Sequence, residues 1–304
     1  MLASFNYTKT GEDERVAVDK DVKNGREFPF RLCGDGFQLL ENVSLPLGPL
    51  LPPRDKAALR RRLQESVLPL AKTLTGADHA FFYPVLLRSE TDEMNDGFKS
   101  SNKPHDVVHN DYTKEFKAYL QEMPRNTVEA FLNLGLKYEQ VQAAKRVVVL
   151  QFWASAQAEG TLLENHPLAI CVPRSVTSTN SLIRYPLPTY GKSDLGSFEI
   201  GLGNADECNS HGECFQLVQL LETTNPHTEW VYFPKMQRSE MLVWCGYDSR
   251  CQPFLPAFHS AFQNPSASLN APPRESVEMR VLCLFDEDSG PDFLPHNTTT
   301  SSKL

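Results

Sequence analysis

Two short stretches, far apart in the chain, carry side chains that bind transition metals. His109 and Asp111 are separated by one residue, so on an extended segment both side chains leave the same face. His259 lies far downstream, in the segment Phe258-His-Ser-Ala-Phe262. Two imidazoles and one carboxylate, with coordination positions left open, form the ligand set that suits a non-haem Fe(II). The sequence therefore predicts an iron site at which an oxidant and a substrate meet.

The His-x-Asp motif is weak evidence by itself. A chain with eight histidines carries such a motif by chance about half of the time, and most of its histidines are ordinary core or surface residues. The order of the elements strengthens the case. His109 and Asp111 lie at a predicted strand-to-helix junction in the first half of the chain, and His259 lies in a predicted loop just before the last strand. Together these positions favour an iron site.

The predicted last strand opens with Arg274 and Ser276. This is the pair that 2-oxoglutarate requires, because its keto acid end chelates the metal and its distal carboxylate needs a fixed guanidinium and a hydroxyl donor. Arg280 lies on the same face of the strand, so either arginine is a candidate for the carboxylate. In the alternative reading both arginines are surface charges on an edge strand, paired with Glu275 or Glu278.

The elements that position these residues divide between the two halves of the chain. Apolar periodicity predicts an amphipathic helix over 54–74 and two short helices over 113–123 and 126–142. Strands are predicted over 80–87, 147–153, 168–172, 215–221, 229–233, 241–245 and 277–285. Helices followed by serial strands indicate a mainly β protein with flanking helices, built on a β-barrel or a jelly roll.

The predicted domain organisation is simple. We expect an extended polar arm over 1–27, a single oxygenase domain over 28–290 and a flexible tail over 291–304. The tail ends in Ser302-Lys-Leu304, the tripeptide that a peroxisomal import receptor reads. The expected location is therefore intracellular, in the peroxisome or otherwise the cytoplasm.

Composition excludes several classes of partner. The formal net charge of -8 argues against a broad nucleic-acid surface, and no apolar run is long enough for a membrane span. The seven cysteines contain no CxxC pair, which favours reduced thiols in an intracellular compartment. The chain lacks the GxSxG motif of serine hydrolases, which argues against a hydrolase. A small molecule is the expected substrate, and the sequence does not determine the oligomeric state.

Several blocks of sequence are shared with a known family: Gly36-Phe37, Leu74-Thr-Gly-Ala77, His109-Asn-Asp111, Pro167-Leu-Ala169, Arg174-Ser-Val176, Trp230-Val-Tyr232, Tyr247-Asp-Ser-Arg250, His259-Ser-Ala-Phe262 and Arg274-Glu-Ser-Val-Glu-Met-Arg280. They cover nearly the whole chain, and the last three are the most specific. In these blocks the chain resembles the hydroxylase/desaturase family of microbial (fungal) secondary metabolism, which includes a gibberellin desaturase and a cephalosporin methoxylase component. Because members of this family are similar to Fe(II)/2-oxoglutarate oxygenases, the resemblance implies a double-stranded β-helix.

One block departs from the family. Relatives usually carry Trp-Arg-Pro where this chain has Trp153-Ala154-Ser155. If the missing arginine faces the barrel interior, its loss changes contacts to the substrate or the co-substrate. Either the substrate differs in charge, or a remaining arginine such as Arg174 contacts the acid.

The predicted function is oxidation of an unactivated C–H bond. We expect His109, Asp111 and His259 to hold Fe(II), with 2-oxoglutarate and O2 as co-substrates and hydroxylation, desaturation or ring closure as the outcome. The expected substrate is a secondary metabolite or an amino-acid-derived molecule. Apolar strands predicted to face inward place Gln151, Trp153, Cys283 and Phe285 in the pocket lining, with core packing as the alternative for each. Two rival functions remain: an iron-dependent oxidase or isomerase that does not use 2-oxoglutarate, and an inactive barrel that serves as an accessory subunit.

Overall fold

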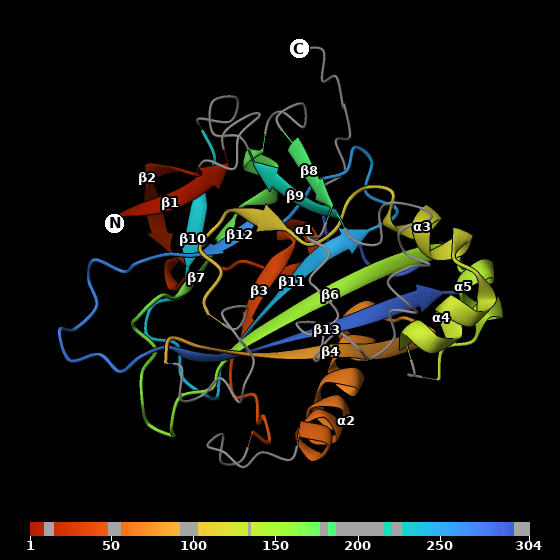
Figure 1. Cartoon of the computed structure of the whole chain (residues 1–304), viewed down its shortest axis with the longest axis horizontal. Coiled ribbons are helices and arrows are strands. Elements are labelled where there is room, and N and C mark those ends of the chain that lie inside the picture. Colours follow the sequence, from red (N-terminus) through yellow and green to blue (C-terminus); the bar gives the residue numbers. More distant parts are fainter. Residues whose placement is uncertain are drawn as a thin grey trace.

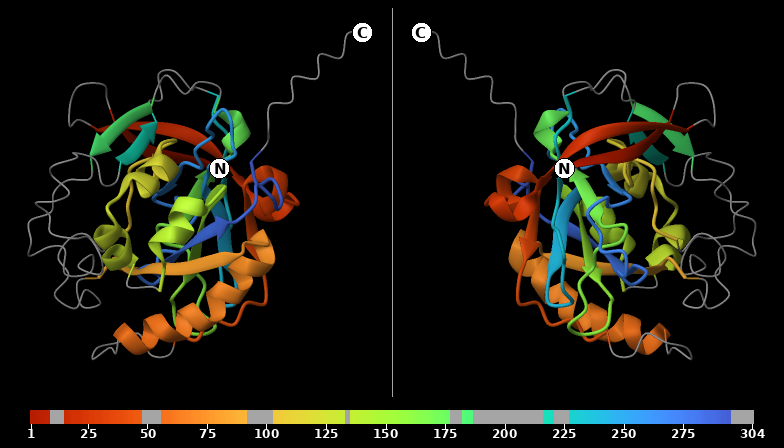
Figure 2. Two further views of the ribbon diagram at one scale, coloured as in Figure 1. Left: turned by 90° about the vertical axis from the view of Figure 1, so that its right-hand side faces the viewer. Right: turned by 90° about the vertical axis from the view of Figure 1, so that its left-hand side faces the viewer.

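Two β-sheets packed face to face form the body of the protein (Figures 1 and 2). A computed structural model describes residues 1–8, 15–47, 56–91, 103–132, 135–176, 182–186, 216–220 and 227–294. Among the described residues no helix is long and apolar enough to cross a membrane. Residues 187–215 and the tripeptide Ser302-Lys-Leu304 lie outside the described ranges.

The first sheet has five antiparallel strands in the order β3-β11-β6-β13-β4. Their bounds are β3 Phe37–Leu40, β4 His79–Ser89, β6 Arg146–Ser155, β11 Met241–Asp248 and β13 Glu275–Phe285. The continuous apolar run in β6 reflects its central position, because all ten of its residues are buried. The last strand, β13, lies between β6 and β4 and is not an edge strand, so the alternative of surface charges on an edge strand is wrong.

The second sheet has the order β1-β2-β10-β7-β12-β5-β9-β8. Its strands are β1 Leu2–Thr8, β2 Arg15–Asn24, β5 His109–Asn110, β7 Leu168–Cys171, β8 Leu182–Pro186, β9 Gln216–Leu220, β10 Trp230–Tyr232 and β12 His259–Ala261. The segment 1–27 was expected to be an extended arm, but most of it forms β1 and β2, and β2 pairs with β10. Alternating apolar residues explain this difference, since Phe5 is buried and stacks on Trp230 with 4.3 Å between ring centroids.

The helices flank the sheets. There are five α-helices in the described ranges: α1 Leu32–Asp35, α2 Lys56–Thr75, α3 Phe116–Glu122, α4 Arg125–Leu132 and α5 Tyr138–Ala143. Short 3-10 helices follow β2 at Gly25–Glu27 and β7 at Pro173–Ser175. The predicted amphipathic helix is confirmed as α2, which packs its apolar stripe on the outer face of the five-stranded sheet (Figure 2). Helices α3, α4 and α5 gather at one end of β6 and β13 (Figure 1).

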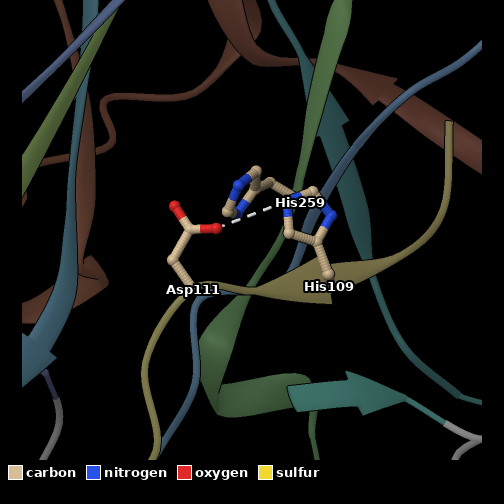
Figure 3. A group of neighbouring side chains, drawn as sticks. All are labelled: His109, Asp111 and His259. Carbon is tan, nitrogen blue, oxygen red and sulfur yellow. Dashed lines mark ion pairs between the residues drawn. The ribbon is translucent and has the colours of Figure 1, made fainter. Parts of the chain in front are cut away.

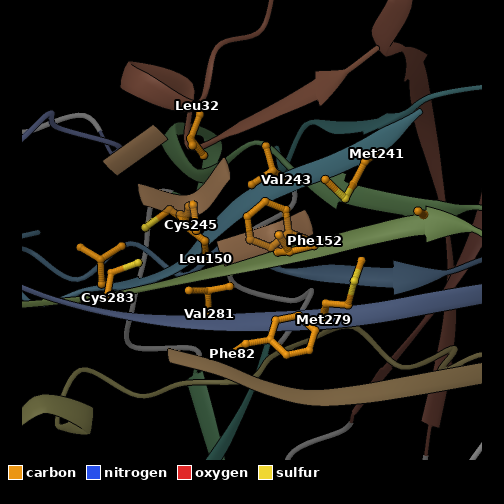
Figure 4. Packing of buried hydrophobic residues seen from close by; sticks show 14 of the residues in the cluster. Leu32, Phe82, Leu150, Phe152, Met241, Val243, Cys245, Met279, Val281 and Cys283 are labelled. Atoms are coloured by element: carbon orange, nitrogen blue, oxygen red, sulfur yellow. The ribbon is translucent and has the colours of Figure 1, made fainter. Parts of the chain in front are cut away.

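Alternation along β6 and β13 separates an outer core from an inner face. The outer core lies between the five-stranded sheet and α2 and contains Phe152, Met279, Val281 and Cys283 (Figure 4). Gln151 and Trp153 on β6, and Ser276, Glu278 and Arg280 on β13, take the opposite direction. Further along β13, Leu282 and Leu284 on that side pack against the cluster of α3, α4 and α5.

Candidate metal centre

Neighbouring strands of the eight-stranded sheet bring the two histidines together. His109 on β5 and His259 on β12 are directly paired in register, and their rings are 4.4 Å apart between centroids. His259 therefore lies on a strand, where the sequence predicted a loop. Asp111 follows β5 by one residue, and its side chain turns towards both rings (Figure 3). The ligand atoms of all three residues lie within 4.8 Å of one another, which meets the distance requirement for one metal ion.

The histidines are held in the form that metals bind. Nδ1 of His109 lies 2.7 Å from the carbonyl oxygen of Val107, and Nδ1 of His259 lies 3.1 Å from that of Ala257. Because a carbonyl can only accept, Nδ1 carries the hydrogen in each ring and Nε2 keeps its lone pair. Burial lowers the pKa of both imidazoles, which keeps them neutral. The donor set therefore fits a divalent transition metal.

Among the described residues, Asp111 accepts hydrogen bonds through one of its two oxygens. Its Oδ2 accepts from the Gln151 amide at 2.6 Å and from the Arg280 guanidinium at 2.5 Å and 3.1 Å. Its Oδ1 lies on the side of His109, 3.6 Å from Nε2. Burial opposes ionisation, but the positive charge of Arg280 prevails and holds the pKa of Asp111 well below its usual range. The carboxylate is thus ionised with one oxygen available as a ligand.

A small cavity between the two sheets adjoins His259. Its lining includes Gln151, Leu168, Trp244, Glu278 and Arg280. The indole nitrogens of Trp244 and of the neighbouring Trp153 are buried and have no hydrogen-bond partner among the described residues. Since a buried N–H without an acceptor is costly, these donors suit a ligand that carries oxygen acceptors.

Arg274 immediately precedes β13. Its side chain is buried, with Nε donating to the Ser276 hydroxyl at 3.0 Å and Nη1 donating to the carbonyl of His166 at 2.6 Å. The guanidinium also packs over the Trp153 ring at 5.1 Å from its centroid. Among the described residues nothing accepts a hydrogen bond from Nη2. Burial lowers the pKa of Arg274 to about 10, so the group stays protonated at neutral pH.

Three of the predicted pocket residues lie elsewhere. Cys283 and Phe285 belong to the outer core against α2, where the Thr75 hydroxyl donates to the Cys283 sulfur at 3.9 Å. Arg174 is exposed and pairs with Asp35 at 2.7 Å. Ala154 also lies in the outer core, so the position where relatives carry arginine does not face the metal ligands. Of the predicted lining residues, Gln151 and Trp153 are on the inner face.

Several charged neighbours of the site were not predicted from the sequence. Glu278 lines the cavity and accepts from Nε of Arg88 at 2.5 Å; although burial opposes ionisation, Arg88 and Arg280 hold the pKa of Glu278 below its usual value. His105 packs edge-on against His109 with 4.3 Å between ring centroids, and burial lowers the pKa of His105 to about 4. The period-2 pattern of β13 was a usable signal for Glu278, whereas no local pattern pointed to Arg88 or His105.

The fold and the ligand set define a class of protein, the jelly-roll metalloenzymes with a mononuclear site of two histidines and one carboxylate. The chain belongs to the family described as oxidoreductase/YMDC permease-like domain, whose model matches residues 4–284. The predictions of an oxidoreductase and of the hydroxylase/desaturase resemblance are thereby confirmed.

Individual relatives agree with this assignment. The chain is 24% identical over 283 residues to the Fe(II)/2-oxoglutarate-dependent dioxygenase nvfI of Aspergillus novofumigatus. The aligned region covers 92% of this chain and 85% of the relative. A variant of the iron and alpha-ketoglutarate-dependent endoperoxidase NvfI superposes with a TM-score of 0.67 at 20% identity, covering 95% of this chain and 97% of the other. Another structure of NvfI gives 0.64 at 20% identity, covering 94% and 98%. These superpositions confirm the predicted fold.

Proposed function

We propose that this protein is a non-haem Fe(II)/2-oxoglutarate-dependent oxygenase that oxidises a small organic substrate with O2. The observation that carries the proposal is the set of His109, Asp111 and His259, whose ligand atoms lie within 4.8 Å of one another. Nδ1 of each histidine is bonded to a backbone carbonyl, so Nε2 stays available as a ligand. The curated relative that matches most of the chain is named for the same cofactor pair. The rival oxidase or isomerase requires the triad alone and leaves Arg274 with Ser276 unexplained.

Each side chain of the centre has a defined task. His109 and His259 supply neutral nitrogen ligands, and the carbonyls of Val107 and Ala257 fix the orientation of the rings. Asp111 supplies an anionic oxygen. When bound, Fe(II) with 2-oxoglutarate and O2 supplies the oxidising power for C–H cleavage. His109 and His259 are buried, and Trp244, which lines the cavity, offers its indole N–H to an oxygen atom of a molecule bound there.

Arg274 and Ser276 are our assignment for the distal carboxylate of 2-oxoglutarate. Arg274 is already oriented by Ser276 and His166, and Nη2 remains to form the charge-assisted hydrogen bond. Arg280 was the other candidate. Its guanidinium is committed to Asp111, so we assign it to the metal ligand and not to the co-substrate.

For the substrate we propose a secondary metabolite or an amino-acid-derived molecule bound near Trp153 and Gln151. The relative NvfI is named an endoperoxidase. Hydroxylation, desaturation and ring closure are the reaction types that we propose for this chain. Cys283, Phe285 and Arg174 are not part of this pocket.

The decisive experiment is anaerobic addition of Fe(II) and 2-oxoglutarate to the purified protein. A charge-transfer absorption that requires both additions, and succinate formation once O2 is admitted, are the expected results. Iron binding without any effect of 2-oxoglutarate would favour the oxidase or isomerase. Failure of the protein to bind iron would favour the accessory-subunit reading.

We also propose peroxisomal import through Ser302-Lys-Leu304. The support is the tripeptide itself and the polar segment that precedes it. A fluorescent protein fused ahead of the intact chain is expected to enter peroxisomes, and the same fusion without the three residues is expected to stay outside. Identical distributions would refute the proposal.

A further inference from the structure

Gly246 lies on β11 beside Gln151 of β6, at an irregularity in the pairing of these two strands. The register shifts between Cys245 and Tyr247, so Gly246 is the unpaired residue of a β-bulge. A β-carbon at position 246 would lie 2.0 Å from Oε1 of Gln151, 2.9 Å from its Cδ and 3.3 Å from its Cγ. These are the three nearest atoms, so the space that the missing side chain leaves is filled by one residue, Gln151.

Gln151 uses that space to reach Asp111. Its Nε2 donates to Oδ2 of Asp111 at 2.6 Å, and this orientation is required because a carboxylate can only accept. The amide oxygen therefore points the other way, towards the backbone of Gly246. A β-carbon at 246 would therefore force the Gln151 amide to move. Glycine is not needed here for a left-handed backbone, because Gly246 is not among the glycines with positive φ.

Gln151 and Arg280 together restrict how Asp111 binds a metal. Both donate to Oδ2, at 2.6 Å and 2.5 Å, so that oxygen is withdrawn from the metal and Oδ1 is presented alone. Two anchors on one oxygen also fix the rotation of the carboxylate. Since outer partners of a metal ligand typically contribute about 10- to 100-fold in metal affinity, loss of one anchor has a measurable effect.

We propose that Gly246 is a positioning residue of the metal centre: it admits the Gln151 amide, which with Arg280 holds Asp111 for coordination through Oδ1 alone. This inference rests on the proposed function in that Asp111 must be a metal ligand. It assigns a role to Gly246 that neither the His-x-Asp motif nor Arg274 and Arg280 indicate.

The test is a double-variant cycle read by Co(II) binding to the full-length metal-free protein, with the visible absorption of the bound Co(II) as the signal. Gly246→Ala and Gln151→Ala are each expected to weaken Co(II) binding by about tenfold or more. The double variant is expected to bind no more weakly than Gln151→Ala alone, because the added methyl group then meets no amide. The thermal unfolding midpoint of each metal-free variant provides the control for folding.

Each outcome decides the inference. Wild-type affinity in Gly246→Ala, or losses that add in the double variant, would overturn it. If Gly246→Ala alone fails to fold, a folded double variant with the affinity of Gln151→Ala supports the inference, and an unfolded double variant refutes it. If the wild type itself binds no Co(II), the proposed function fails as well. Wild-type binding with an insensitive Gly246→Ala overturns this inference alone.

Discussion

Replacement of Arg274 by glutamine removes the group that we assign to the distal carboxylate of 2-oxoglutarate. The guanidinium is 1% exposed, so its bond to a bound carboxylate is shielded from water. A hydrogen bond to a charged group contributes about 1.5–3 kcal/mol, which corresponds to about 10- to 100-fold in the dissociation constant of 2-oxoglutarate. Arg274→Lys keeps the charge but loses the fork that bonds Ser276 and His166, so an intermediate loss is expected.

The assay is anaerobic titration of the Fe(II)-loaded protein with 2-oxoglutarate, followed by charge-transfer absorption, because it needs no knowledge of the substrate. Fe(II) affinity should stay unchanged, since Arg274 contacts none of the three ligands in the described structure. Arg174→Gln is the matched control: that arginine is exposed and bonded to Asp35, so its loss should not alter the titration. A wild-type dissociation constant for 2-oxoglutarate in Arg274→Gln would refute the assignment.

Further predictions concern the metal, the N-terminal strands and acid stability. His109→Ala should abolish Fe(II) binding in a calorimetric titration, and tight binding that persists would remove His109 from the ligand set. Deletion of residues 1–24 should leave the protein insoluble or lower its thermal unfolding midpoint by several degrees, because the deletion exposes Trp230. An unchanged midpoint would mean that residues 1–24 contribute nothing to stability, as expected of an extended arm. Burial opposes ionisation of Glu240, but the Arg26 hydrogen bond lowers its pKa below the ordinary 4.5. The stability that this pair supplies is therefore present above pH 4.5 and lost as pH falls through the folded pKa, so urea unfolding of Glu240→Gln should approach that of the wild type only in acid.

The sequence predicted those features that depend on local pattern. The apolar run of β6, the amphipathic α2 and the spacing of His109 and Asp111 are local, and each appears in the structure as expected. The same alternation that puts Arg274 and Arg280 on one face puts Cys283 and Phe285 on the other. Cys283 and Phe285 were predicted as pocket residues because they are apolar, although the two-residue alternation of the strand places them on the opposite face from Arg280.

The features that escaped prediction depend on contacts between distant segments. The direct pairing of His109 with His259 follows from the neighbouring positions of β5 and β12, which no local pattern encodes. Arg280 reaches Asp111 across 169 positions of sequence, so its commitment to a metal ligand was not visible beside the equally plausible role in 2-oxoglutarate binding. The N-terminal strands were missed because their polar residues face outward and conceal the alternation of Ala3, Phe5 and Tyr7, which are all buried.

The pairing of buried charges supports Arg274 as the co-substrate anchor independently of any motif. Arg280 is paired with Asp111, and Arg88 is paired with Glu278. The guanidinium of Arg274 donates to a hydroxyl and a carbonyl, and no carboxylate in the described ranges accepts from it. A buried cation without a bonded anion is costly, as the lowered pKa of Arg274 indicates. A dicarboxylate that leaves one end for Arg274 while the other chelates the metal removes this cost, and its binding should therefore stabilise the fold even in the absence of substrate.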